Sequence, residues 1–333
     1  MAYTIIKDLV SILTPCYNGA KIIHRLLDSV LQQDYPCIEM IVVDDGSTDE
    51  SKEIIVSYYG KFKEKGYSLS YIYQENKGQA SAINNGLKKV TGEFLIWPDS
   101  DDFFSSSSSI STFVLSFAKL GQEYGVVRCY ANVLDEQNLR ILYQRKHNVD
   151  KERIFEEYFT CIESIAGAGL YMVRMEAFDD VNPSRDIFSE EKPQNWQLLL
   201  PILYFYKIFT IKKPLHNIVV ASHSHSREKK TYKEHIAGFN GYLAILKNTL
   251  SKIKMNSSDR DRFLEICVVR NILDKLDIAL KFYQRKEVVR YIKQLKEHNY
   301  QLSSGKKIKV ALLILSPALL RIMTKVVRMV KIL

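Results

Sequence analysis

Short apolar runs alternate with longer segments of helical periodicity at the start of the chain. The apolar runs have the length of buried strands and lie at 10–13, 38–43, 69–73 and 94–97. Between them, residues 22–31 and 79–90 carry apolar side chains at helical spacing. Ser47 and Glu50 have the spacing of a capping box, which predicts another helix starting there. This regular alternation of strand and helix favours an α/β fold with a mainly parallel sheet.

The pattern becomes less regular further along the chain. Four more strands are predicted at 126–130, 141–143, 170–173 and 218–221, with a helix at 110–120. From Tyr232 onward the apolar spacing is helical. A chain of 333 residues is long enough for two domains. We therefore expect an α/β domain over 1–228 and a helical region over 229–333.

Polar loops follow the four N-terminal strands. They lie at 15–19, 44–47, 74–78 and 99–102. In open parallel α/β sheets, ligands bind outside the carboxyl ends of the strands. The four loops are therefore expected to line one crevice at this edge of the sheet.

The fourth loop is strongly acidic, with Asp99, Asp101 and Asp102 directly after an apolar run. Residues i and i+2 of an extended segment point to the same side, so Asp99 and Asp101 are expected to converge. Two close carboxylates repel each other unless a cation lies between them. Mg²⁺ typically binds one or two carboxylates together with substrate phosphates. Taken alone, such a motif is also typical of an acidic surface loop.

Four motifs occur in order within the first 102 residues: TPCYNG, VVDDGSTDES, ENKGQASAINNGL and WPDSDD. Together they resemble the nucleotide-sugar domain of family 2 glycosyltransferases, which have the GT-A fold. The resemblance implies an inverting transferase that uses a nucleotide-activated sugar and a divalent metal, Mg²⁺ or Mn²⁺. The fold that it implies is a mixed, mainly parallel sheet flanked by helices, here followed by the helical region.

The resemblance also implies roles for individual residues. Asp101 and Asp99 would bind the metal, with Asp101 the better candidate for direct contact. The residues implied at the donor nucleotide are Pro15, Tyr17, Asn18, Asp45, Asn76, Lys77, Asp99 and Ser100. From the residues alone, Tyr17 can also be a packing aromatic, Asp44 a brace for the following turn, and Asn84 a packing or solvated residue of a helix.

Inverting transfer needs a general base that takes the proton of the acceptor hydroxyl. The family usually presents a Glu-Asp pair before a helix with an aromatic residue, and Gln194, Asn195 and Trp196 stand at that position here. Amides cannot act as the base. We expect Glu191, or else Glu190, to take this role, while the residues 194–196 contact the acceptor sugar with Asn195 at the catalytic position. The alternative is that both glutamates are solvated charges at a helix start.

A His-x-His segment follows the strand predicted at 218–221. His223 and His225 fall on one side of an extended segment, as in a metal pair, but no third ligand lies nearby in the sequence. The family often has a Ser-His-Ser-Arg segment here, whose histidine approaches the metal or the diphosphate. The resemblance therefore implies that His225 is a further metal ligand and that Arg227 belongs to the same segment.

Charge and composition bear on location and partners. The net charge is +9, and no acidic residue occurs after Glu297. Basic and apolar residues over 306–333 predict an amphipathic helix on an anionic membrane surface, at the inner face of the cell membrane. An oligomer-forming or core-packing helix is the alternative. The 5 cysteines include no CxxC pair and the N-terminus has no signal-peptide core, so a reduced cytoplasmic setting is expected.

These features together predict a transferase that moves a sugar from a nucleotide-diphosphate donor to a glycan or lipid-linked glycan in cell-surface polysaccharide synthesis. The lipid link depends on the basic tail alone. A nucleotide-sugar-binding protein without catalysis is the alternative, because amides stand at the position of the base. Nucleic-acid binding is not expected, because the positive charge gathers toward the C-terminus and no nucleic-acid motif occurs.

Overall fold

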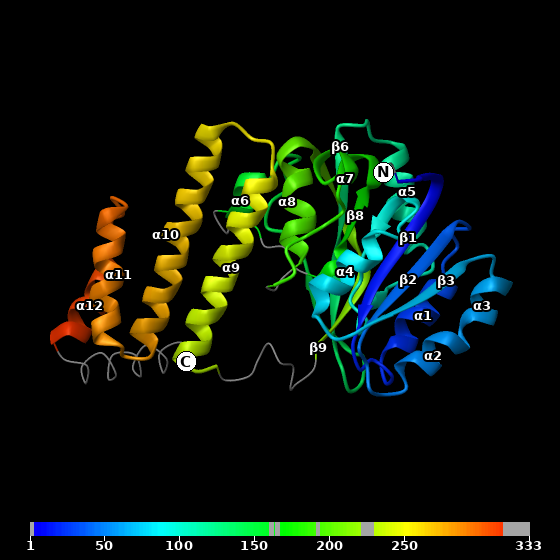
Figure 1. The fold of residues 1–333 in the computed structure, drawn as a ribbon, viewed down its shortest axis with the longest axis horizontal. Helices are drawn as coiled ribbons and strands as arrows, with labels where there is room; N and C mark the ends of the chain where they lie inside the picture. The colour runs from blue at the N-terminus through cyan, green and yellow to red at the C-terminus, as the bar shows by residue number, and fades with distance from the viewer. Residues whose placement is uncertain (1–2, 160–162, 164–166, 191–193, 221–229, 316–333) are drawn as a thin grey trace. The chain divides into compact units, whose positions relative to one another are not determined.

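The computed structural model describes residues 3–159, 163, 167–190, 194–220 and 230–315 (Figure 1). The chain divides into two compact units. Unit 1 consists of Met1–Arg227 together with Asn248–Lys254, and unit 2 consists of Glu228–Lys247 together with Met255–Leu333. The short stretch 248–254 thus belongs to the α/β unit, although it lies within the helical part of the sequence.

Unit 1 is built on one nine-stranded sheet with the order β3-β2-β1-β4-β8-β6-β9-β5, in which β7 pairs with β6. The parallel half consists of β1 (Ile6–Cys16), β2 (Ile38–Asp45), β3 (Ser68–Gln74) and β4 (Gly92–Ile96). The other half contains β5 (Phe103–Phe104), β6 (Tyr124–Asp135), β7 (Ile141–Arg145), β8 (Tyr171–Arg174) and β9 (Lys207–Val220). Each antiparallel pair in the described residues includes at least one strand of this second half, as β8 does with β4, so the predicted mixed sheet is confirmed.

Helices flank the sheet in unit 1 (Figure 1). They are α1 (Ile23–Leu31), α2 (Ser51–Ser57), α3 (Tyr59–Glu64), α4 (Gln79–Leu87), α5 (Ser109–Ala118), α6 (Phe155–Phe159), α7 (Met175–Val181) and α8 (Asn195–Phe205). A 3-10 turn at Ala168–Leu170 precedes β8. α4 packs closely on the sheet, because a Cβ on Gly86 would lie 2.1 Å from Leu13 Cδ1 and 3.1 Å from Val43 Cγ2. The glycine lets the helix backbone approach β1 and β2, whose carboxyl ends carry two of the polar loops.

The start of α2 differs from the prediction. The helix begins at Ser51 instead of near Ser47, and its N-cap residue Glu50 makes no capping hydrogen bond, whereas Asp49 Oδ1 accepts the Ser51 N–H at 3.1 Å. Ser47 is engaged by its own turn instead: its N–H donates to Asp44 Oδ1 at 2.8 Å, and its Oγ accepts the N–H of Asn18 at 2.9 Å. The capping-box prediction was therefore wrong, because two other loop residues take the polar groups of the serine.

β9 is much longer than its prediction. It runs over 14 residues, of which the pattern at 218–221 marked only the end. Lys212, Lys213 and Pro214 interrupt the apolar pattern, and the register between β6 and β9 shifts where Tyr130 faces Pro214. A proline is tolerated inside a sheet at such an irregularity. The interrupted apolar pattern is also the reason why the earlier part of β9 was not predicted from the sequence.

Unit 2 is helical. α10 (Ser257–Lys281), α11 (Arg285–Glu297) and α12 (Ser304–Leu315) pack around one apolar cluster, and most of α9 (Tyr232–Lys252) belongs to the same unit. The most buried members of the cluster are Leu276, Ala279, Val288, Tyr291, Leu295 and Leu313. No helix in the described part of the chain is long and apolar enough to span a bilayer.

The segment 306–333, predicted as an amphipathic membrane helix, lies only partly within the described residues. Its first part belongs to α12, where Val310 and Leu313 are buried in the apolar cluster. Lys306 Nζ lies 2.9 Å from Asp277 Oδ2 of α10. These residues pack within unit 2, which was the alternative interpretation of this stretch. Residues 316–333 lie outside the described residues, and membrane contact there stays a prediction.

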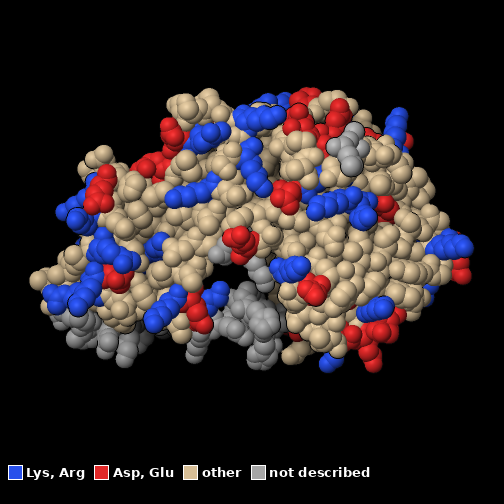
Figure 2. Space-filling model, in the orientation of Figure 1, with Lys and Arg blue, Asp and Glu red and all other residues tan. Residues whose placement is uncertain are grey.

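The two units differ in charge. Unit 1 has 26 Lys and Arg residues against 29 Asp and Glu, whereas unit 2 has 21 against 9. The positive net charge of the chain therefore comes from the helical unit. On the face in view in Figure 2, Lys and Arg side chains are interspersed with Asp and Glu and do not merge into one large basic patch.

Candidate active site

The carboxyl ends of the parallel strands stand side by side. Cys16 at the end of β1 is in register with Asp44 of β2, and Asp45 is in register with Gln74 at the end of β3. β4 lies on the other side of β1 and runs parallel to it. The four polar loops therefore leave the same edge of the sheet (Figure 1).

The loop after β2 is held by short polar side chains. Asp44 Oδ1 accepts the Ser47 N–H at 2.8 Å, and Asp44 Oδ2 accepts the Tyr71 hydroxyl at 2.7 Å. Asn18 has a left-handed backbone with φ 49°, and its Oδ1 accepts the Thr48 N–H at 2.9 Å. Asp44 thus braces the turn, as one interpretation of the sequence held, and the amide oxygen of Asn18 serves the same loop.

Asp45 connects the ends of β2 and β3. Within the described residues, its Oδ1 accepts Gln74 Nε2 at 2.7 Å and the Lys77 N–H at 2.9 Å, and its Oδ2 accepts the Gly78 N–H at 2.9 Å. The loops touch closely, since a Cβ on Gly46 would lie 2.7 Å from the backbone nitrogen of Asn76. A carboxylate offers about four acceptor positions, so Asp45 can accept one further hydrogen bond from a ligand.

The predicted donor-binding residues differ in exposure. Tyr17 is 53% exposed, which makes it a surface aromatic at this edge and not a packing residue. Asn76 and Lys77 are exposed as well, whereas Pro15 is buried in β1 opposite Val43. Tyr73, near the end of β3, is 59% exposed and was not singled out from the sequence.

The acidic turn, residues 99–102, follows β4 and accepts hydrogen bonds from neighbouring elements. Asp99 Oδ1 accepts Gln79 Nε2, at the start of α4, at 2.6 Å. Asp102 is buried, and its Oδ1 accepts the Val219 N–H near the end of β9 at 3.0 Å. Asp101 is exposed. Ser100 lies near the loop after β1, because its Oγ would be 3.8 Å from a Cβ on Gly19. The turn therefore leaves Asp101 as the carboxylate most open to a ligand.

Burial and neighbouring negative charge disfavour the ionised carboxylates of the acidic turn. Burial, with the charges of Asp102 and Asp101, raises the pKa of Asp99 to about 7. Partial burial raises the pKa of Asp101, and burial together with the charge of Asp101 raises the pKa of Asp102 well above its usual value. A cation at this turn would relieve the repulsion.

The donor set of the turn fits a hard divalent cation. Carboxylate oxygens are the ligands that Mg²⁺ and Mn²⁺ prefer, and Mg²⁺ needs only one or two of them when substrate phosphates supply the others. Among the described residues, no group of three or more His, Cys, Asp or Glu side chains is gathered to hold a metal ion. Asp99 and Asp101 could therefore hold a metal together with a bound diphosphate, but they do not form a complete protein cage.

His216, on β9, lies beneath the acidic turn and was not predicted. It is fully buried, its Nε2 lies 3.7 Å from Asp102 Oδ2, and its ring packs on Gly169, where a Cβ would come within 2.3 Å. Burial lowers the pKa of His216 to about 4, so the ring is neutral. Within the described residues, neither of its ring nitrogens has a hydrogen-bond partner. No motif marks this histidine in the sequence, because it lies in the part of β9 that the pattern concealed.

The amides predicted at the acceptor lie next to the acidic turn. Trp97, the residue after β4, donates from Nε1 to Asn195 Oδ1 at 2.8 Å, which ties the start of α8 to the turn. Gln194 is buried, and Trp196 is also buried, packed edge-on against Tyr158 and Phe159. The side-chain oxygen of Asn195 thus serves a structural contact.

The two candidate bases differ in how far they can be placed. Glu190 is exposed at the end of the described segment before α8. Glu191 lies outside the described residues, as do His223, His225 and Arg227. The structure therefore brings together the polar loops after β1, β2 and β3, the acidic turn and the start of α8, and the roles of these four residues stay predictions.

Relatives of this chain are known by sequence. A family model described as glycosyl transferase family 2 matches residues 11–182, which is more than half of the chain. An uncharacterized glycosyltransferase of Rickettsia prowazekii is 34% identical over 167 residues, covering 50% of each chain. Another of Rickettsia typhi is 33% identical over 160 residues, covering 48% of each. The chain thus spans about half the length of these curated relatives.

Solved structures share the fold. S. aureus TarS 1–349, in complex with UDP-GlcNAc, superposes with a TM-score of 0.60 at 17% identity, covering 92% of this chain and 89% of that one. The mannosyltransferase PcManGT from Pyrobaculum calidifontis, in complex with GDP-Man and Mn²⁺, gives 0.54 at 17% identity, covering 94% and 86%. The likeness confirms the predicted GT-A architecture. With the family model matching more than half of its length, this chain belongs to glycosyl transferase family 2.

Proposed function

We propose that this chain is an enzyme that moves a sugar from a nucleoside-diphosphate sugar to a hydroxyl of a glycan or lipid-linked glycan, with inversion. The observation that carries the proposal is the meeting of the Asp45 loop and the acidic turn at the start of α4. There the Gly78 N–H donates to Asp45 Oδ2 at 2.9 Å, and Gln79 Nε2 donates to Asp99 Oδ1 at 2.6 Å. Membership of the family, and the nucleotide sugars bound by TarS and PcManGT, support it.

The nucleotide would lie over the ends of β1, β2 and β3. The exposed ring of Tyr17 offers a face on which a base can stack. Asp45 has acceptor capacity left for a base N–H, and Asn76 and Lys77 are exposed beside it for the base or ribose. Asn18 and Ser100 border the same loops. Pro15 would act from within β1, by shaping the loop that carries Tyr17.

The diphosphate would lie at the acidic turn. Asp101 and Asp99 would hold Mg²⁺ or Mn²⁺ there, and we propose His225 as a further ligand. A divalent metal in this place would stabilise the negative charge that develops on the departing diphosphate. The Mn²⁺ bound by PcManGT supports this choice.

The acceptor hydroxyl would be deprotonated from the segment before α8. We propose Glu191 as the general base, with Glu190 as the second candidate, because the amides of Gln194 and Asn195 cannot accept a proton at neutral pH. Asn195, at the position where the family carries a carboxylate, and Trp196 would shape the acceptor side. The base must come within about 2.6–3.2 Å of the hydroxyl that it deprotonates.

The setting of the reaction follows from charge. We propose a cytoplasmic enzyme that rests on the inner face of the cell membrane through residues 316–333, where a lipid-linked acceptor for cell-surface polysaccharide would be found. The excess of basic residues in unit 2 supports this proposal.

The proposal can be tested by screening nucleotide sugars for thermal stabilisation that depends on Mg²⁺ or Mn²⁺. A ligand that binds only the folded protein at 100 times its Kd stabilises by about 2.7 kcal/mol, so the correct donor should shift the melting temperature clearly. If no nucleotide sugar stabilises the chain with either metal, the proposal fails.

A nucleotide-sugar-binding protein without catalysis is the second candidate. It is favoured by one observation, the hydrogen bond from Trp97 Nε1 to Asn195 Oδ1, because the amide that the family resemblance puts at the position of the base makes a structural contact. Donor binding without transfer across a panel of glycan and lipid-linked acceptors would establish it.

A further inference from the structure

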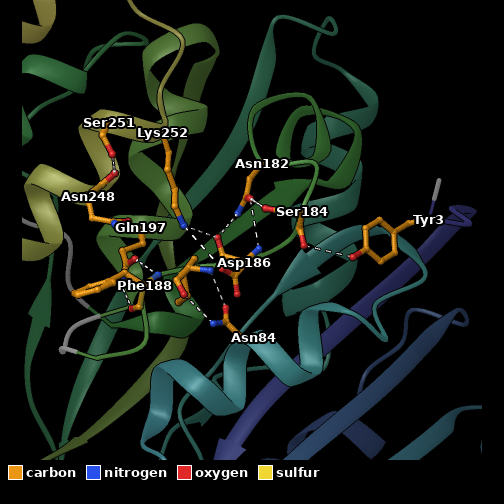
Figure 3. A network of polar contacts seen from close by, with 11 residues as sticks. Tyr3, Asn84, Asn182, Ser184, Asp186, Phe188, Gln197, Asn248, Ser251 and Lys252 are labelled. Carbon is orange, nitrogen blue, oxygen red and sulfur yellow. Dashed lines mark hydrogen bonds and ion pairs between the residues drawn. The ribbon is translucent and has the colours of Figure 1, made fainter. Parts of the chain in front are cut away.

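The backbone at Ile187 and Phe188 is held by two side-chain amides from different helices. Asn84 of α4 donates from Nδ2 to the Ile187 carbonyl and accepts the Ile187 N–H on Oδ1, both at 2.8 Å. Gln197 of α8 donates from Nε2 to the Phe188 carbonyl at 2.8 Å and accepts the Phe188 N–H on Oε1 at 2.7 Å. Figure 3 shows both amides directed at this stretch of backbone. Two consecutive residues are thus fixed through all of their backbone polar groups. We call Asn84 and Gln197, with the backbone of Ile187 and Phe188 that they bind, the amide clamp.

The residues just before Ile187 are held as well. Arg185 is fully buried, has a strained left-handed backbone with φ 48°, and donates to both carboxylate oxygens of Asp179 at 2.7 Å and to the Val90 carbonyl at 2.6 Å. Lys252 Nζ reaches the Asp186 carbonyl at 3.5 Å (Figure 3). The segment therefore enters the clamp in one fixed direction.

The clamp joins α4 and α8 to the segment that leads to Glu190. Glu190 follows Phe188 by two residues, and further along the chain Asn195 is tied to Trp97 beside the acidic turn. α4, which supplies Asn84, also supplies Gln79 to Asp99. One helix thus sets the acidic turn at its start and the approach to Glu190 from its later turns.

We propose that Asn84 and Gln197 are positioning residues that set where the base-bearing segment, with Glu190, stands relative to the acidic turn. This inference rests on the proposed function, since it requires a carboxylate of that segment to take the acceptor proton. Proton transfer tolerates little error in distance, and a displacement of about 1 Å can cost about 100-fold in rate. Each amide side chain binds both the backbone N–H and the carbonyl of one residue, Ile187 or Phe188. Its loss therefore releases the backbone of a residue two or three positions before Glu190.

The test uses the full chain, the nucleotide sugar that stabilises it with metal, and an acceptor on which it acts. Asn84→Ala and Gln197→Met should each lower kcat by about 10–100-fold, with donor Kd changed by less than about 2-fold. Asn85→Ala is the matched control, because within the described residues the side chain of this neighbour on α4 makes one long hydrogen bond, 3.4 Å from Nδ2 to Gln74 Oε1. Both Asn→Ala changes raise helix propensity equally, and the control should retain wild-type kcat.

A second measurement separates positioning from a general structural role. Asn84→Ala is combined with whichever glutamate→Gln variant has lost transfer, Glu190→Gln or its neighbour. Because this variant has no general base whose position could change, adding Asn84→Ala should lower its residual rate by less than about 2-fold. A full multiplicative loss in that background overturns the inference.

The remaining outcomes are also decisive. If the wild type transfers sugar and both amide variants do so at the wild-type rate, the positioning inference fails while the proposed function stands. If the wild type neither binds nor transfers a nucleotide sugar, the proposed function fails first and the inference with it. The two variants act from different helices, so one that loses its melting transition leaves the other to decide. If both lose it, the clamp is a folding element and the inference is overturned.

Discussion

Unit 1 and unit 2 use their polar residues in different ways. In unit 1, the polar side chains at the sheet edge bind backbone groups of neighbouring loops, as Asp45 does at Lys77 and Gly78. In the described part of unit 2, several polar side chains form ion pairs at the surface, such as Arg290 with Glu287 at 2.7 Å. Exposed pairs of that kind contribute about 0–1 kcal/mol each. The hydrogen bonds of unit 1 build a site, whereas the charges of unit 2 form a surface.

The charge of the whole chain describes neither unit. The net charge of +9 combines a slight acidic excess in unit 1 with a strong basic excess in unit 2. A basic chain can contain an acidic turn, because the turn lies in unit 1 whereas the excess of basic residues lies in unit 2. We therefore expect donor binding to depend on unit 1 and surface binding on unit 2, and the following experiments test that division.

The largest effect is expected at the acidic turn. Asp101→Ala and Asp99→Ala should each abolish metal-dependent donor binding, because metal coordination is worth several kcal/mol and each carboxylate is a proposed ligand. Donor affinity measured by calorimetry in Mn²⁺ and in Mg²⁺ checks this, with circular dichroism to show that the fold is intact. Asp261→Ala, an exposed carboxylate of unit 2, is the control and should bind donor normally. Unchanged donor affinity in both turn variants would remove the metal assignment.

The next effect is expected at the C-terminus. Deleting 316–333 removes Arg321, Lys325, Arg328 and Lys331. Each basic residue near anionic lipid adds about 1 kcal/mol, so binding to anionic vesicles should fall by about 1000-fold. The cut is placed after Leu315 because α12 packs into the apolar cluster of unit 2. Vesicle sedimentation measures the loss.

Donor affinity should not change in the truncated chain. A full-length variant with the four basic residues replaced by Gln is the control that separates charge from apolar insertion. If the truncated chain sediments with anionic vesicles as well as the full chain does, the anchor prediction is wrong. If it also loses donor binding, the division between the units is wrong.

Most of unit 1 could be predicted because β2, β4 and the later part of β1 are buried on both faces. Such strands appear in the sequence as short, nearly continuous apolar runs that end in turn residues. β9 could not be predicted in full, because Lys212, Lys213 and Pro214 interrupt its apolar pattern. His216, beneath the acidic turn, was missed for the same reason.

The motifs revealed the carboxylates of the site but not the contacts that hold them. Asp99 and Asp101 are close in sequence, so their convergence follows from strand geometry. Asn84 and Ile187 are 103 residues apart, and no local rule connects them. One signal was available: Asn84 and Asn85 stand inside a predicted helix, although Asn is a poor helix former that needs a reason to be there.

A third experiment concerns the general base of unit 1. Glu191→Gln should lower turnover by about 100-fold or more while leaving donor affinity unchanged, because the residue would face the acceptor. Glu190→Gln is measured beside it, and Glu176→Gln, an exposed glutamate of α7, is the control. Initial rates at saturating donor give the comparison. Should neither Glu190 nor Glu191 matter, the base lies elsewhere or the chain binds sugar nucleotides without transferring them.

The smallest effect is expected at Asn195. Asn195→Ala leaves the buried Trp97 N–H without its acceptor, which costs about 1–3 kcal/mol. The start of α8 should then loosen, so the acceptor KM should rise by about 10-fold with a smaller loss of kcat. Asn195→Asp keeps an acceptor for Trp97 and should restore most of the acceptor affinity.

The matched change in unit 2 is Asn271→Ala, because this buried amide donates to the Phe239 carbonyl at 2.6 Å. It should cost similar stability, seen in the melting temperature, without any change in acceptor KM. Acceptor titrations of all three variants therefore separate a hydrogen bond that shapes the site from one that only stabilises a helix pair. If Asn271→Ala raises the acceptor KM as much as Asn195→Ala does, loss of stability explains both, and the contact between Trp97 and Asn195 has no particular part in acceptor binding.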